Sequence, residues 1–142
     1  MTPQRLEGPG FTIELEERAG YLRAVVRGAE DTLAVSTAYW HRLGAECRGR
    51  GAAAILVLED LPPWPDADPE VFEAVTDAMA AAGFRDIRCA FVDLNEEVEA
   101  NEYGMIVGAD KGLTIMMFSN ESYAERWLRF GSPHPTAIRP GA

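Results

Sequence analysis

Hydrophobic and polar positions alternate or cluster along the chain in a way that predicts five strands. In residues 11 to 16 (FTIELE) every second side chain is apolar, which indicates a strand with one wet face. A turn at residues 18 to 20 and the β-prone run 21 to 27 complete an antiparallel hairpin. The runs 53 to 58 and 89 to 92 are apolar throughout, as in central strands covered on both faces. Residues 113 to 118 predict the last strand.

Two helices are predicted around the third strand. The first begins after Asp31 or Thr32, either of which is a suitable N-cap. The second has Asp68 as N-cap, Pro69 at the first helical position and Glu70 in the first turn, where the helix dipole favours an acid. The apolar stripe of the first helix is expected at Ser36, Trp40, Leu43 and Cys47.

A third and a fourth helix should be capped by Asn95 and Ser119. Their apolar faces are expected at Val98, Met105, Ile106 and Ala109, and at Tyr123, Trp127, Leu128 and Phe130. The order β-β-α-β-α-β-α-β-α predicts a single α/β domain, residues 11 to 130, with a mixed, mostly parallel five-stranded sheet and four helices. We expect residues 1 to 10 and 131 to 142 to be flexible ends.

The closing segment 117 to 128 (MFSNESYAERWL), together with this order, resembles the SpoIIAA-like branch of the STAS (sulphate transporter and anti-sigma-factor antagonist) superfamily. In that branch a final strand ends in Phe and is followed by a polar cap and an Ala-x-x-Trp-Leu helix. Here Phe118, Ser119 and the segment 124 to 128 match. The resemblance implies a STAS-like fold and a non-catalytic binding or regulatory role, through protein–protein contacts or a small, even apolar, molecule.

The loop before the second helix is where signalling members of the superfamily carry a phosphorylatable Ser or Thr. Residues 61 to 75 (LPPWPDADPEVFEAV) contain neither, so the switch is absent in its usual form. One reading gives Asp68 and Glu70 a permanent negative charge where the phosphate would sit, at a helix N-terminus. Capping by Asp68 is the simpler explanation.

Polar residues at the carboxyl ends of the predicted parallel strands are further candidates, because ligands of open α/β sheets gather there. With the two acids above, the expected contact residues are Glu59, Asp60, Trp64, Asp68, Glu70, Asp93, Asn95 and Ser119. Glu59, Asp60 and Asp93 are the alternative: oxygen ligands for Mg²⁺ in a hydrolase or phosphoryl-transfer enzyme. Their spacing is not diagnostic of metal, so we expect no metal, no other cofactor and no catalysis.

Trp64 stands between two prolines, where it is either an exposed anchor or lid for a partner or folded back over the second helix. A homodimer through the Trp64 loop, or through Tyr123 and Phe130 of the fourth helix, is a further option.

Composition narrows the classes of partner. The chain has 142 residues and a net charge of −10, which argues against nucleic acid and anionic membrane surfaces. Its apolar runs are too short to span a bilayer and the N-terminus has no secretion signal, so we expect a cytoplasmic protein. Cys47 and Cys89 fall in predicted core positions and should be reduced, and neither histidine has an evident catalytic partner.

Overall fold

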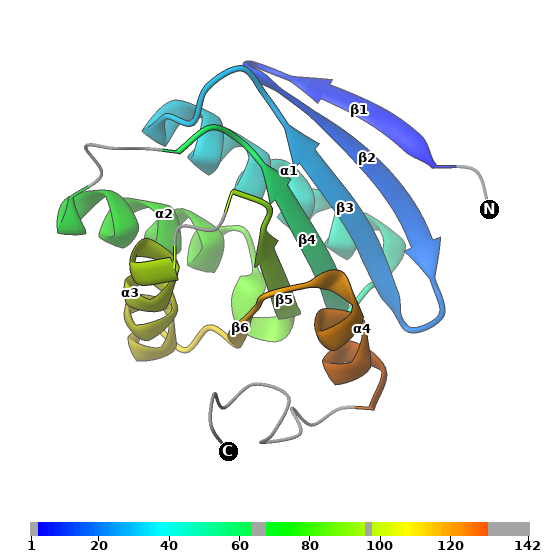
Figure 1. The fold of residues 1–142 in the computed structure, drawn as a ribbon. Helices are drawn as coiled ribbons and strands as arrows, with labels where there is room; N and C mark the ends of the chain where they lie inside the picture. The colour runs from blue at the N-terminus through cyan, green and yellow to red at the C-terminus, as the bar shows by residue number, and fades with distance from the viewer. Residues whose placement is uncertain (1–2, 64–67, 96–97, 131–142) are drawn as a thin grey trace.

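The computed structural model describes residues 3–63, 68–95 and 98–130 (Figure 1). One half of its β-sheet is antiparallel and consists of β1 (Gln4–Gly8), β2 (Phe11–Arg18) and β3 (Tyr21–Arg27). The hairpin of β2 and β3 confirms the sequence expectation, and Gly20, at φ +88°, permits its tight turn.

The parallel half consists of β4 (Ala54–Asp60), β5 (Arg88–Asp93) and β6 (Ile115–Phe118), and β3 is parallel to β4. The strands lie side by side in chain order, β1-β2-β3-β4-β5-β6. The single α/β domain and its mixed sheet are confirmed, but the sheet has six strands and not five.

The strand β1 corrects our expectation that residues 1 to 10 are flexible. It pairs with β2 from Gln4↔Leu15 to Gly8↔Phe11. Within β1 only Leu6 is buried, and the other residues are exposed or half-buried. An edge strand with one apolar side chain lacks the alternation that identifies a strand in a sequence.

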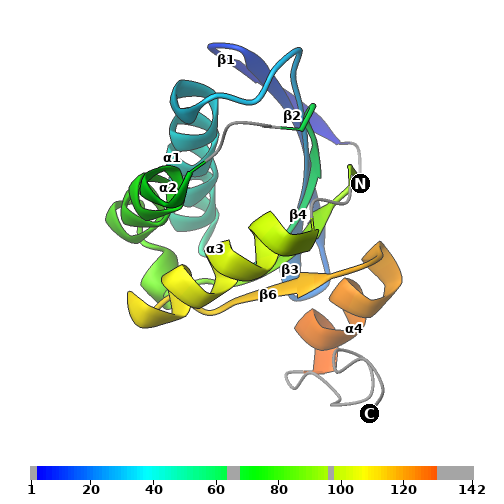
Figure 2. The ribbon, with the colours of Figure 1, turned by 60° about the vertical axis from the view of Figure 1, so that its left-hand side comes forward.

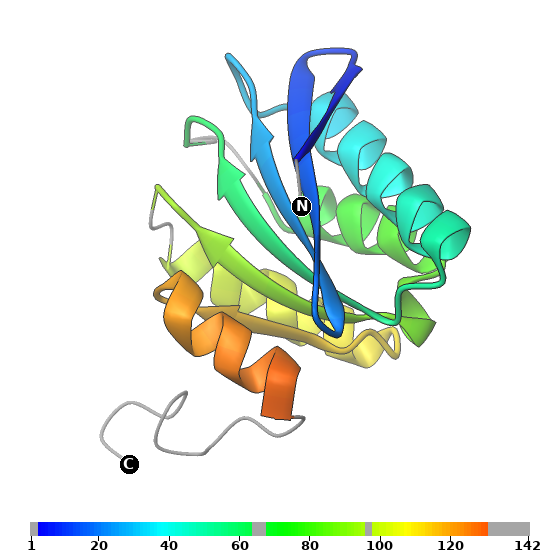
Figure 3. The ribbon, with the colours of Figure 1, turned by 90° about the vertical axis from the view of Figure 1, so that its right-hand side faces the viewer.

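Three helices cover one face of the sheet and one covers the other (Figures 2 and 3). The first three are α1 (Leu33–Arg50), α2 (Pro69–Ala81) and α3 (Val98–Asp110), and the fourth is α4 (Glu121–Phe130). A short 3₁₀ turn, η1 (Phe84–Asp86), precedes β5. Successive parallel strands are added in one direction, so right-handed crossovers place α1, α2 and α3 on the same face. Among the described residues, no helix is both long and apolar enough to cross a membrane.

Two cores result. The larger lies between the sheet and α1 to α3, where Trp40 packs edge-on against Phe84, with ring centres 5.3 Å apart, and lies 6.0 Å from Phe91. The smaller lies between the sheet and α4. Cys47 and Cys89 are free, buried thiols, as expected, and burial raises the pKa of Cys47 to about 11.

The starts of α1 and α2 follow the sequence. The Thr32 hydroxyl accepts a hydrogen bond from the Val35 N–H at 3.1 Å, and Asp68 caps α2. The start of α4 is different: the Asn120 side chain accepts from the Tyr123 N–H at 3.0 Å, so Asn120, and not Ser119, is the cap. Asn95 lies three residues before α3, and residues 96–97 between them are outside the described residues.

The expected buried faces of α3 and α4 need correction. In α3, Ile106 is 60% exposed and Ala109 is exposed, while Val107 and Gly108 are buried; the Val98 side chain is outside the described residues. A Cβ on Gly108 would lie 3.1 Å from Ile115, so this glycine lets the helix approach the sheet. In α4, Trp127 and Leu128 are buried with Ala124, but Tyr123 and Phe130 are exposed.

Candidate functional site

Glu59 and Asp93 are the two strand-end carboxylates that the fold brings together. They are register partners at the ends of β4 and β5. Directly opposed residues of parallel strands point to the same side, and the Glu59 contact with α1 identifies this as the face of the three helices. The ends of β4 and β5 thus place these two carboxylates next to each other on one face of the sheet.

Glu59 accepts a hydrogen bond from the hydroxyl of Tyr39, a fully buried residue of α1. Burial, and then the negative charge of Glu59, raise the pKa of Tyr39 well above its ordinary value, so the phenol stays protonated and donates. Nearby, the Ser36 hydroxyl donates to Asp31 at 2.7 Å. The Tyr39 bond fixes the end of β4 against α1, and the Ser36 bond fixes the first turn of α1 to the segment before it.

Asn95 and Asp93 organise the loop after β5. The Asn95 N–H donates to Asp93 Oδ1 at 2.8 Å, and the Asn95 side-chain amide donates to the Leu61 carbonyl. The Leu94 N–H donates to the Glu59 carbonyl at 2.9 Å. Asn95 thus ties together the two loops that follow β4 and β5.

Asp60 lies on the opposite face of the sheet from Glu59, because successive residues of a strand alternate. Its carboxylate is 3.5 Å from Arg27 Nε, and Arg27 also binds Glu14 at 2.7 Å. Glu59, Asp60 and Asp93 therefore do not converge on one cation. In the part of the chain that the structure describes, no three His, Cys, Asp or Glu residues are placed to hold a metal ion.

The start of α2 holds the two acids considered as a phosphate substitute. One oxygen of Asp68 accepts from the Glu70 N–H at 3.0 Å and from the Val71 N–H at 3.3 Å. Capping thus accounts for this carboxylate, and Glu70 is exposed beside it. Trp64 lies outside the described residues. Ser119 is exposed at the end of β6.

A surface that the sequence reading missed lies where α3 meets α2 (Figure 1). We define the α2–α3 surface as Phe72, Tyr103 and Ile106. The Phe72 and Tyr103 rings meet edge to face, with centres 5.4 Å apart, and Tyr103 and Ile106 are 40% and 60% exposed. The available signal was that α3 has apolar residues in every direction, more than one core face needs.

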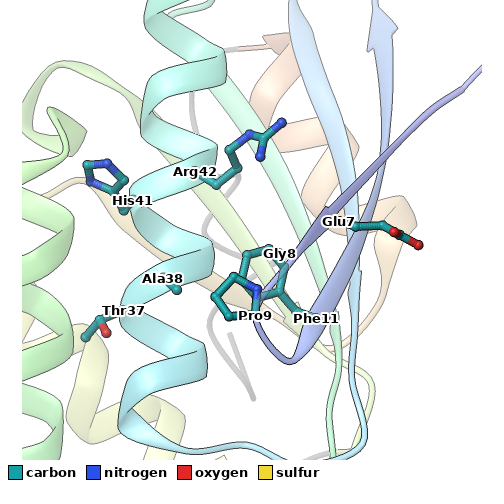
Figure 4. A pocket seen from close by; sticks show the side chains of 8 residues that line it. All are labelled: Glu7, Gly8, Pro9, Phe11, Thr37, Ala38, His41 and Arg42. Atoms are coloured by element: carbon teal, nitrogen blue, oxygen red, sulfur yellow. The ribbon is translucent and has the colours of Figure 1, made fainter.

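A shallow hollow of about 390 Å³ lies between the β1–β2 turn and α1 (Figure 4). Its lining consists of Glu7, Gly8, Pro9, Phe11, Thr37, Ala38, His41 and Arg42. None of the residues predicted for a site contributes to it, so the hollow and the strand-end cluster are separate features.

The chain matches no protein-family model and no curated protein.

Proposed function

We propose that this protein is a non-catalytic binding or regulatory domain of the SpoIIAA-like, STAS type, and that it binds another protein through the α2–α3 surface. The observation that carries the proposal is the exposure of Ile106, an aliphatic side chain that is 60% exposed in the middle of a helix. Beside it Tyr103 combines a large apolar ring with a polar end, a residue type enriched in protein interfaces. A scattered exposed Leu or Ile is ordinary, but adjoining exposed apolar side chains favour a contact surface.

Charge around this surface indicates the kind of partner. The exposed acids of α2 and α3 near it are Glu70, Glu73, Asp77, Glu102 and Asp110. Lys111 binds Glu73 at 2.7 Å and Asp77 at 2.8 Å and neutralises part of this charge. The remaining acidic rim favours a partner that presents basic side chains around an apolar centre. A second copy of this acidic chain would meet like charge here.

The strand-end residues support binding over chemistry. Glu59 holds the Tyr39 phenol, Asp60 lies beside Arg27, and Asp93 holds the loop at Asn95. Each carboxylate has a structural task at its own place, and no oxygen-ligand set for a cation gathers from Glu59, Asp60 and Asp93.

The test is capture of interacting proteins on the full chain, followed by measurement of one purified partner. Ile106→Glu adds a charge at the centre of the α2–α3 surface, and Ala34→Glu, at an exposed position of α1, is the matched control. We expect Ile106→Glu to weaken the Kd at least about tenfold, Ala34→Glu to leave it unchanged, and added salt to weaken binding. Equal Kd values for the wild type and Ile106→Glu would refute the α2–α3 surface.

Two further measurements separate the remaining readings. Asp68→Asn combined with Glu70→Gln keeps a capping residue and removes both charges; loss of partner binding at unchanged stability would establish the phosphate-substitute role. Native mass spectrometry, compared with the denatured mass, detects a retained small molecule. A retained apolar compound with no protein partner would replace the protein-binding proposal with a small-molecule one.

A further inference from the structure

The two edges of the sheet are built differently. The outer edge of β1 carries Arg5 and Glu7, an exposed pair 3.4 Å apart, and β1 ends at Gly8 before Pro9. Charged side chains and a proline turn are devices that prevent further strands from pairing. The other edge, β6, reads IMMF and has no charge. Within residues 3–63, 68–95 and 98–130, nothing pairs with the outer side of β6.

Backbone groups on that outer side can be assigned. The Thr114 carbonyl accepts a hydrogen bond from the Cys89 N–H at 2.9 Å, so it points toward β5. Because backbone groups of successive strand residues point alternately to the two sides, those of Ile115 and Met117 point outward. A half-buried strand of apolar residues thus presents N–H and C=O groups that no other strand among the described residues pairs with.

Helix α4 adds exposed apolar side chains next to this edge, on one face of the sheet. Its Glu121 and Glu125 face β3, where they accept hydrogen bonds from Arg23 and Tyr21. The other side of the helix faces β6, because the Trp127 ring lies 5.8 Å from that of Phe118.

Tyr123 and Phe130 lie one turn before and after Trp127, so the three form one stripe. Tyr123 is 39% exposed and Phe130 72% exposed. We define the β6 edge as strand β6 together with Tyr123 and Phe130.

We propose that the β6 edge binds the β6 edge of a second copy, so that two antiparallel β6 strands join the two sheets. A two-fold axis perpendicular to the sheet brings the same uncharged strand onto itself and keeps α4 of both copies on one face. Pairing about Met117 sets Met116 opposite Phe118 of the other copy, apolar against apolar on the α4 face. Tyr123 and Phe130 then cover the added strand.

The distribution of charge and the protection of the β1 edge both favour a second copy of the chain as the partner of the β6 edge. The acids of α4 nearest the sheet, Glu121 and Glu125, are held toward β3, away from the contact. The four side chains of β6 carry no charge, so pairing two β6 strands brings no like charges together within the added ladder. Once two β6 edges have paired, the sheet formed by the described strands has only the protected β1 edges left, and assembly stops at a dimer.

Size sets the expected strength. A four-residue strand and two exposed aromatic side chains are small against the roughly 1,200 Å² that stable interfaces bury, so we expect a Kd in the range of about 10–100 µM. This contact does not involve the α2–α3 surface, and its failure would leave the proposed protein-binding role untouched.

The test is sedimentation of the full chain over a concentration series from about 5 to 500 µM, which brackets that Kd. The wild type should rise from the 15.6 kDa of one chain toward twice that mass. The double variant Tyr123→Lys with Phe130→Lys replaces both exposed aromatic side chains of the β6 edge by charged ones, so this variant should remain at the mass of one chain. Leu33→Lys is the matched control, because Leu33 is also 39% exposed but lies in α1; it should dimerise like the wild type.

Hydrogen exchange at the Met117 amide distinguishes strand pairing from any other dimer. This outward N–H should exchange more slowly as the protein concentration rises, while the inward groups of β6 change little. A wild type that remains monomeric throughout, a lysine variant that still dimerises, or a dimer in which Met117 exchange is independent of concentration would each overturn the proposal. Circular dichroism confirms that each variant is folded.

Discussion

The close approach of α1 and α2 at Gly44 provides the sharpest test of the packing. A Cβ on Gly44 would lie 2.4 Å from the Ala82 carbonyl oxygen and 2.7 Å from the Ala82 Cβ, so the two elements have no room for a methyl group. The obstacle is mainly backbone at the end of α2, which cannot rotate away as a long side chain can. Gly44→Ala therefore forces the helices apart.

The magnitude follows from two opposing effects. Replacing glycine by alanine within a helix stabilises it by about 1 kcal/mol. Overpacking a well-filled core costs about 1–3 kcal/mol, and contacts this short on backbone atoms place Gly44→Ala toward the upper end. We expect a net loss of about 1–2 kcal/mol. Gly49→Ala, in the same helix, meets nothing within 4 Å and should stabilise by about 0.5–1 kcal/mol.

Urea unfolding of the wild type and both variants measures the difference directly, provided that the slopes agree. The two alanine variants should lie on opposite sides of the wild type. If Gly44→Ala is as stable as Gly49→Ala, the helices are not in close contact at Ala82, and the packing described for the larger core is wrong.

Three further outcomes concern pH and capping. Burial raises the pKa of Cys47 from 9.0 to about 11, so the neutral thiol contributes to the free energy of unfolding in full below pH 9, and this contribution, up to about 3 kcal/mol, should be lost between pH 9 and 11. Cys47→Ala should flatten that part of the curve of stability against pH. An unchanged curve would contradict the raised pKa. A hydrogen bond from Arg23 lowers the pKa of Glu121, so this pair stabilises the folded protein above the unfolded pKa of 4.5, and that stability is lost as the pH falls through the lower folded pKa. Between pH 7 and 3, Glu121→Gln should therefore lose less stability than the wild type in urea unfolding. Equal losses would count against the pair. Asp68→Ala should cost about 1 kcal/mol while Asp68→Asn costs little, as thermal unfolding will report; equal costs would mean that the cap is unimportant.

Local signals account for what the sequence predicted correctly. The hairpin, β4, β5 and the starts of α1 and α2 depend on alternation, continuous apolar runs and N-caps, which act between residues close in the chain. The errors arise where residues distant in the chain determine which side of an element is buried. In α3 the apolar residues surround the helix, and the side that packs is set by two glycines: Gly104 against Phe72 and Gly108 against Ile115.

The sequence predicts where the strand-end residues lie better than it predicts which side chains they contact. That Glu59 and Asp60 point to opposite faces follows from strand alternation alone, and it already argues against a shared cation. The link from Tyr39 to Glu59 joins α1 to β4 and has no local signature, although Tyr39 does lie at helical spacing from Ser36 and Leu43. The α2–α3 surface depends on which side of α3 packs: apolar residues all around the helix indicate that some stay exposed, but not which ones.

The order of the strands has a consequence for synthesis on the ribosome. Each strand pairs with the strand made just before it, so the sheet can assemble progressively as the chain emerges. The exception is α4, which returns to β3 through contacts 98 and 104 residues apart in the chain. Until α4 is made, the apolar residues of its face, among them Val25 and Leu56, remain without their cover. A nascent chain of this protein therefore exposes one apolar side of a formed sheet until α4 has been made, and it is open to aggregation during that interval.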